Sequence, residues 1–117
     1  GKASLKVKSL RTALGVFSAL RADGNCQATS LSYYYLAKTV RRLLPEDSLE
    51  RNSLILKVFR LCCEDGCLNN QVLRQIKQAL PLPERRKLFP EYDADRVRVS
   101  ELPCEWSANA LLEERRT

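Results

Sequence analysis

LERNSLILKVFRLCCEDG, residues 49–66, is the stretch that decides the fold, because it carries the densest apolar run in the chain. Its apolar residues cover well over half of a helix circumference, which is typical of a central helix packed on two sides. An upstream stretch, ALGVF at 13–17 followed by Asp23-Gly24, matches ILKVF at 55–59 followed by Asp65-Gly66, with a constant offset of 42 residues (13 to 55). The match predicts a repeated helical unit.

Four main helices are predicted from the spacing of apolar side chains and from the residues that begin and end helices. The third begins near Asp47, which with Glu50 three residues later resembles a capping box. Glycine ends the first and third helices because it readily takes the left-handed conformation of a helix stop. The predicted helices cover residues 4–22, Thr29 or Ser30 to Leu44, Asp47 to the stop at Gly66, and Asn69 or Asn70 to Leu80. Since their connections are short, they should form stacked antiparallel hairpins in an all-α fold.

The last part of the chain, residues 81–117, lacks the long runs of helically spaced apolar residues found in residues 1–80. Glu84 to Leu88 is predicted to add one helical turn, and residues 90–103 an irregular, proline-containing strap. Ser107 is predicted to cap a short last helix, Ala108 to Arg116.

Trp106, the only tryptophan, lies just before that cap, where an apolar residue often packs against the first helical turn. We interpret it as an anchor that pins the tail onto the helical core of residues 1–80, with a ligand contact as the alternative. At 117 residues the core and the tail are expected to form one domain.

The charge of the chain is concentrated near its N-terminus. The formal net charge is +6, and residues 1–44 alone hold eight Lys and Arg against the single acid Asp23. Such a field favours an acidic partner, whether nucleic acid, an anionic membrane surface or an acidic protein. Ordinary solubilising charge is the alternative interpretation.

The number of cysteines and the hydropathy of the chain indicate the cellular compartment in which the protein is expected. Five cysteines, an odd number, favour reduced thiols and an intracellular, reducing location, either an organelle or the cytosol. The CCEDGC spacing at 62–67 is not a usual zinc pattern and the chain has no His, so no metal site is predicted. No apolar run approaches the roughly 18 residues of a membrane span.

No catalytic signature stands out. Histidine, the usual general acid or base, is absent, and four glycines form no phosphate-binding loop, so neither an enzyme nor a cofactor is expected. Basic side chains beside aromatic ones suit a recognition surface, and at least one ring of three consecutive tyrosines should face away from the core. The predicted partner-binding residues are Lys6, Lys8, Arg11, Tyr33, Tyr34, Arg41, Arg42 and Trp106.

Residues 10–80 resemble pentatricopeptide-type helical repeats. The similarity lies in ALGVFSALRADG, TSLSYYYLAKTV, ILKVFRLCCEDG and NNQVLRQIKQAL, in which an "AL-x-VF" helix ends near a glycine and is followed by a second helix. The resemblance implies alternating helices and, at the position of Tyr34, a contact to a base of single-stranded RNA. The segment ELPCEWSANA at 101–110 is similar to the C-terminal ending of such proteins in unicellular algae.

Two functions follow from this resemblance. Folded C-terminal extensions of this kind resemble a targeting domain of algal proteins that enter an endosymbiont-derived organelle, such as a nitrogen-fixing one. The first function is therefore a non-enzymatic recognition module bound by a protein receptor or assembly partner. The alternative is a pentatricopeptide-like RNA-binding module. The sequence leaves the oligomeric state open.

Overall fold

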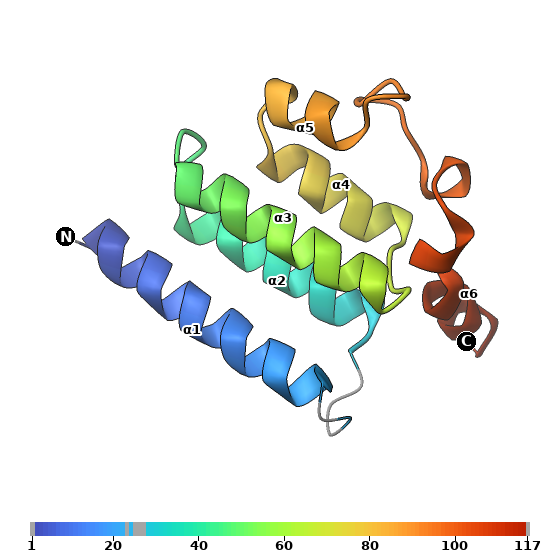
Figure 1. Ribbon diagram of the computed structural model, residues 1–117, viewed down its shortest axis with the longest axis horizontal. Coiled ribbons are helices and arrows are strands. Elements are labelled where there is room, and N and C mark those ends of the chain that lie inside the picture. The colour runs from blue at the N-terminus through green and yellow to red at the C-terminus, as the bar shows by residue number, and fades with distance from the viewer. Residues whose placement is uncertain (1, 23, 25–27, 117) are drawn as a thin grey trace.

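The fold is all-α, as predicted, and consists of antiparallel helical hairpins followed by a strap and a short last helix (Figure 1). The computed structural model describes residues 2–22, 24 and 28–116. Six α-helices and two 3-10 turns lie within these residues: α1 (Lys2–Ala22), α2 (Ser30–Leu43), α3 (Leu49–Glu64), α4 (Asn70–Ala79), α5 (Leu82–Leu88), η1 (Val99–Glu101), η2 (Cys104–Trp106) and α6 (Ala108–Arg116).

Helix α3 is the central helix of the fold. It packs against α1, α2 and α4, and α2 packs closely against α4 (Figure 1). The molecule measures 45 × 37 × 20 Å, and its smallest dimension corresponds to two layers of helices. The strap after α5 runs back to the end of α3, where α6 lies.

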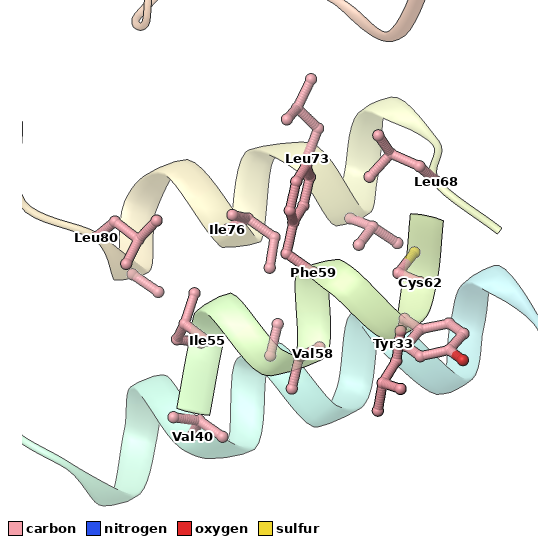
Figure 2. Packing of buried hydrophobic residues seen from close by; sticks show 14 of the residues in the cluster. Tyr33, Val40, Ile55, Val58, Phe59, Cys62, Leu68, Leu73, Ile76 and Leu80 are labelled. Carbon is pink, nitrogen blue, oxygen red and sulfur yellow. The ribbon is translucent and has the colours of Figure 1, made fainter. Parts of the chain in front are cut away.

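The core fills the space between α2, α3 and α4 (Figure 2). Its members come from the apolar spacing that predicted these helices. The side chains with at most 1% of their surface exposed include Tyr33, Val40, Ile55, Val58, Cys62, Leu68, Val72, Leu73 and Ile76. Burial of this set supplies the main driving force for folding.

Side chains cap the starts of three helices. Thr29 and Ser32 form a reciprocal capping box at α2, and the Asn69 side chain accepts a hydrogen bond from the Val72 amide at α4. For α3 the prediction of Asp47 as the cap was wrong. The cap is Ser48, whose hydroxyl accepts from the Arg51 amide at 3.2 Å, because the helix begins one residue later than predicted.

The start of α6 also corrects a prediction. The Ser107 hydroxyl bonds to the Cys104 carbonyl, and the Gly66 carbonyl accepts the first α6 amides, those of Asn109 at 2.8 Å and Ala110 at 2.9 Å. A tertiary contact therefore caps this helix in place of the predicted side chain of Ser107.

Arg51 joins the two hairpins from inside the fold. Only 4% of its surface is exposed, and its guanidinium donates to the carbonyls of Ala79 at 3.1 Å, Leu44 at 3.0 Å and Arg41 at 3.4 Å. These carbonyls lie at the C-terminal ends of α2 and α4, where helix dipoles favour a positive charge. Burial lowers the pKa of Arg51, and the three acceptors compensate for that burial.

Candidate recognition surface

An apolar groove runs between α1 and α2, on the side of this hairpin that faces away from α3 and α4. Its volume is about 310 Å³. Its walls are almost entirely carbon, since the only polar side chains are two hydroxyls and one phenol. The lining residues are Leu10, Ala13, Leu14 and Phe17 from α1, and Ser32, Tyr35, Leu36, Thr39 and Val40 from α2.

Large apolar side chains of the two helices that form the groove are exposed to solvent, and one of them, Tyr35, lines the groove itself. Val16 and Leu20 of α1 are 55% and 44% exposed, and Leu31 and Tyr35 of α2 are 56% and 55% exposed. Single exposed apolar residues are common on proteins, but several of them beside one groove mark a place where another molecule binds.

The sequence of α1 explains why this side stays open. Leu10 and Leu14, at a spacing of four, are buried against the core. Val16 and Leu20, also four apart, lie on a different stripe of the same helix. Because α1 has apolar residues on more than one side but packs on the core with one side only, the second stripe remains uncovered.

Basic residues lie at one end of the groove. Lys6 is one turn before Leu10 on α1, and Arg42 is one turn after Thr39 on α2. The two helices are antiparallel, so these exposed cations belong to the same end, while Leu20 and Leu31 belong to the other (Figure 1). The groove therefore has a basic end and an apolar end.

The other predicted basic residues lie elsewhere. Lys8 and Arg11 line a separate hollow of α1 that also contains Asp47 and Glu50. The pKa of Glu50 is lowered, chiefly by hydrogen bonds from its own backbone amide and the Ser48 hydroxyl and to a smaller extent by Arg11. The carboxylates of this hollow thus offset part of its positive charge. Lys8 and Arg11 therefore do not form one continuous basic surface with Lys6 and Arg42.

Arg41 faces α4 and not the groove. Its guanidinium donates to the side-chain oxygens of Gln75, at 3.1 Å, and of Gln78. The basic face that the sequence predicted as one surface is thus divided among three sides of the molecule, because helical neighbours point in different directions.

The three tyrosines also separate. Tyr33 is fully buried, so its prediction as a contact residue is corrected: its ring packs edge-on against Phe17, and its hydroxyl donates to Asp65. Tyr34 is half-buried beneath the Lys38 ammonium, 5.7 Å from the ring centroid. Tyr35 is the exposed ring, and it was not among the predicted contact residues. Only the orientation of α2 relative to the core could have identified Tyr35 as the exposed ring.

Trp106 lies where the anchor interpretation places it. Its ring packs edge-on against Phe59, with centroids 5.7 Å apart, and Phe59 packs in the same way against Phe89. The Trp106 carbonyl accepts a hydrogen bond from the Leu68 amide at 2.9 Å. Through these contacts Trp106 fixes the tail to α3 and to the connection between α3 and α4.

The described residues contain no group of three His, Cys, Asp or Glu side chains placed to hold a metal ion. Burial raises the pKa of the half-buried Cys63 thiol to about 12, so this sulfur is protonated near neutral pH and is a weak nucleophile. None of the described helices is long and apolar enough to cross a membrane.

Comparison with known proteins adds no assignment. No protein family matches the chain. No curated protein and no solved structure is similar to it either.

Proposed function

We propose that this chain is a non-enzymatic recognition module that binds an amphipathic helix of a protein partner in the α1–α2 groove. The observation that carries the proposal is that α1 and α2, which enclose a groove with apolar walls, also carry four large apolar side chains that are each more than 40% exposed. Contact of such a surface with water raises the free energy of the protein, and a partner that covers the surface lowers it.

A helix is the occupant that fits the shape and charge of this surface. Two antiparallel helices present ridges and a groove into which a third helix packs with its apolar face. Lys6 and Arg42 stand at one end of the groove and Leu20 and Leu31 at the other. The partner helix is therefore expected to carry acidic residues at one end and only apolar contact residues at the other.

The resemblance of residues 10–80 and 101–110 to algal helical C-terminal modules suggests the role of this binding event. In this proposal the partner is a receptor or assembly factor, and its recognition of the module directs the attached protein into an endosymbiont-derived organelle. The rigid attachment of the strap through Trp106 would keep the module folded during that recognition.

The test joins residues 1–117 to a fluorescent reporter in algal cells that contain such an organelle. Three versions are compared: the natural sequence, the groove variant A13E/Y35E, and the control S53E/Q71E. Ala13, Tyr35, Ser53 and Gln71 are all exposed, so each double variant adds two negative charges without entering the core.

The natural sequence and the control should concentrate in the organelle, while the groove variant should remain diffuse. A diffuse natural fusion would reject the targeting role. Equal concentration of the groove variant would reject the α1–α2 groove as the recognition surface.

A further inference from the structure

A second concave surface lies between α4, α5 and the strap, away from the α1–α2 groove. Its volume is about 840 Å³. Five of its side chains are basic and one is acidic. The lining consists of Asn70, Leu73, Arg74, Lys77, Gln78, Arg85, Asp95, Arg96, Val97 and Arg98. We call it the basic groove.

Two of the five cations hold the strap in place. The Lys77 ammonium donates to the carbonyls of Val97 at 3.1 Å and Asp95 at 3.4 Å. The Arg85 guanidinium donates to the Lys77 carbonyl at 3.0 Å and lies 3.3 Å from the Asp95 carboxylate. These contacts give Lys77 and Arg85 a role in holding the strap. The other three cations of the lining need a different explanation.

The other three cations, Arg74, Arg96 and Arg98, are exposed and contribute little to the fold. Arg96 is 3.9 Å from Asp93, but its side chain is 88% exposed, so this ion pair is worth little. For the side chains of Arg74 and Arg98, the described part of the chain offers no hydrogen bond or ion pair. The one carboxylate of the lining, Asp95, is already paired with Arg85.

This arrangement is unfavourable for the protein alone. Arg74 comes from α4, whereas Arg96 and Arg98 come from the strap, so the tertiary structure brings like charges together from separate elements. Like charges in a concave site repel each other and attract anions. Residues whose arrangement does not favour the folded state occur most often at functional or binding sites.

We infer that the basic groove binds an acidic segment of a protein, through the carboxylates of clustered Asp and Glu side chains. Guanidinium groups present paired donors that match the two oxygens of a carboxylate. The side-chain amides of Asn70 and Gln78 also line the groove. Their oxygens already accept from the Val99 amide and from Arg41, which leaves their NH2 groups to donate to the carbonyls of a peptide backbone. Among the described residues no aromatic ring lines the groove, whereas proteins that bind single-stranded nucleic acid combine a basic groove with aromatic rings on which the bases stack.

The ligand would also join α4 to the strap. The strap is held there by Lys77, by Arg85 and by the Asn70 side chain, which accepts from the Val99 amide at 3.1 Å. A peptide bound to Arg74 and Arg98 adds a further link between the same two elements. Binding should therefore raise the melting temperature of the protein, since a ligand that binds only the folded state stabilises it.

The test uses a fluorescein-labelled octaglutamate peptide and a labelled octauridine RNA, each titrated with the 117-residue protein and followed by anisotropy. Three proteins are compared: the natural chain, the groove variant R74Q/R98Q, and the control K57Q/R60Q. The control removes the same charge from two exposed positions of α3 that do not line the basic groove.

Octaglutamate should bind the natural chain more tightly at low salt than at high salt, and R74Q/R98Q should weaken the binding about tenfold. The control should change it less than about twofold. R74Q/R98Q should melt no lower than the natural chain, because it relieves repulsion between like charges.

Three results would overturn the inference: an equal loss of octaglutamate binding in both double variants, no loss in R74Q/R98Q, or tighter binding of octauridine than of octaglutamate. The last would identify nucleic acid as the ligand class. The α1–α2 groove is tested separately, because A13E/Y35E leaves every residue of the basic groove in place and should bind octaglutamate no less than about half as tightly as the natural chain.

Discussion

Helices α1 and α3 share a sequence pattern but have different surroundings. ALGVF in α1 and ILKVF in α3 share leucine, valine and phenylalanine at the same positions, yet Val16 is 55% exposed and Val58 is fully buried. Phe17 is half-buried beside the open groove, whereas Phe59 is only 5% exposed. The pattern forms a helix in both places. The number of other helices that pack against each one decides how much of its surface is buried.

The turns after these two helices differ in the same way. Gly24 and Gly66 both have a left-handed backbone, with φ of 72° and 66°. A Cβ added at Gly24 would meet no atom of the described residues within 4 Å. One added at Gly66 would lie 3.0 Å from the Glu105 carbonyl oxygen and 3.3 Å from the Asn109 amide nitrogen. The second turn is thus also the place where the tail docks.

The comparison teaches that an edge helix keeps a binding surface which a central helix loses. α3 is covered by α2, α4 and the tail, and α1 is covered on one side only. Four sets of substitutions test this difference.

Replacement of the matching phenylalanines should give the largest difference. Phe59→Ala removes a ring that contacts both Phe89 and Trp106, so it should lower the free energy of unfolding by about 3–5 kcal/mol. Phe17→Ala should lower it by roughly half as much, because part of that ring already faces solvent. Urea denaturation measures both, and equal losses would contradict the assignment of α1 to the edge.

Replacement of Gly24 and Gly66 by alanine should give the next largest difference in stability. Gly24→Ala should lower the free energy of unfolding by about 1 kcal/mol, the cost of the left-handed conformation alone. Gly66→Ala should lower it by roughly 2–3 kcal/mol, since the added carbon also displaces backbone atoms of the tail.

Tryptophan fluorescence distinguishes these two glycine variants further, because Trp106 belongs to the tail. The emission spectrum should shift in Gly66→Ala and stay unchanged in Gly24→Ala. The same shift in both would show that the tail does not depend on the second turn.

Tyr33 links the second turn to α2 and makes stability depend on pH. Burial and the hydrogen bond to Asp65 raise the pKa of this phenol above its ordinary value near 10. The folded state therefore keeps the proton that the unfolded state loses, so the contribution of Tyr33 is complete below pH 10 and is lost as the pH rises beyond it.

Tyr33→Phe should cost about 1–3 kcal/mol at pH 7, because it leaves the Asp65 carboxylate with one donor fewer. The difference between the natural chain and the variant should shrink above pH 10. Denaturation curves between pH 7 and pH 11 measure it, and a difference that stays constant would show that Tyr33 ionises equally in both states.

The matching valines include the substitution with the smallest expected effect, Val16→Thr. Val16→Thr should change the free energy of unfolding by less than about 0.5 kcal/mol, because the side chain is already in water. Val58→Thr should lower it by about 1–3 kcal/mol, because its hydroxyl enters the core. A large loss for Val16→Thr would mean that α1 is covered in solution, for example by a second copy of the chain.

Much of the fold was predictable because its signals are local. Apolar residues at helical spacing predicted four helices, and Thr29 and Asn69 were identified as cap candidates from their residue type. The cap of α3 was misplaced because Asp47 and Ser48 are both suitable cap residues, and only the hydrogen bond to Arg51 distinguishes them.

The surfaces were much less predictable. The concentration of charge at residues 1–44 is a property of the sequence, but helical phase sends Lys6, Arg11 and Arg41 to different sides. The basic groove is assembled from α4 and the strap, and no run of basic residues in the sequence marks it.

By itself the sequence determined the helices, their glycine stops and the all-α class, because spacing and helix-end preferences act between residues within a few positions of each other. Only the tertiary structure decided that α1 stays half uncovered, that Arg51 closes the ends of two helices, and that Gly66 receives the tail. Those outcomes depend on which elements meet in space, and residues distant in the chain meet only after the core has packed.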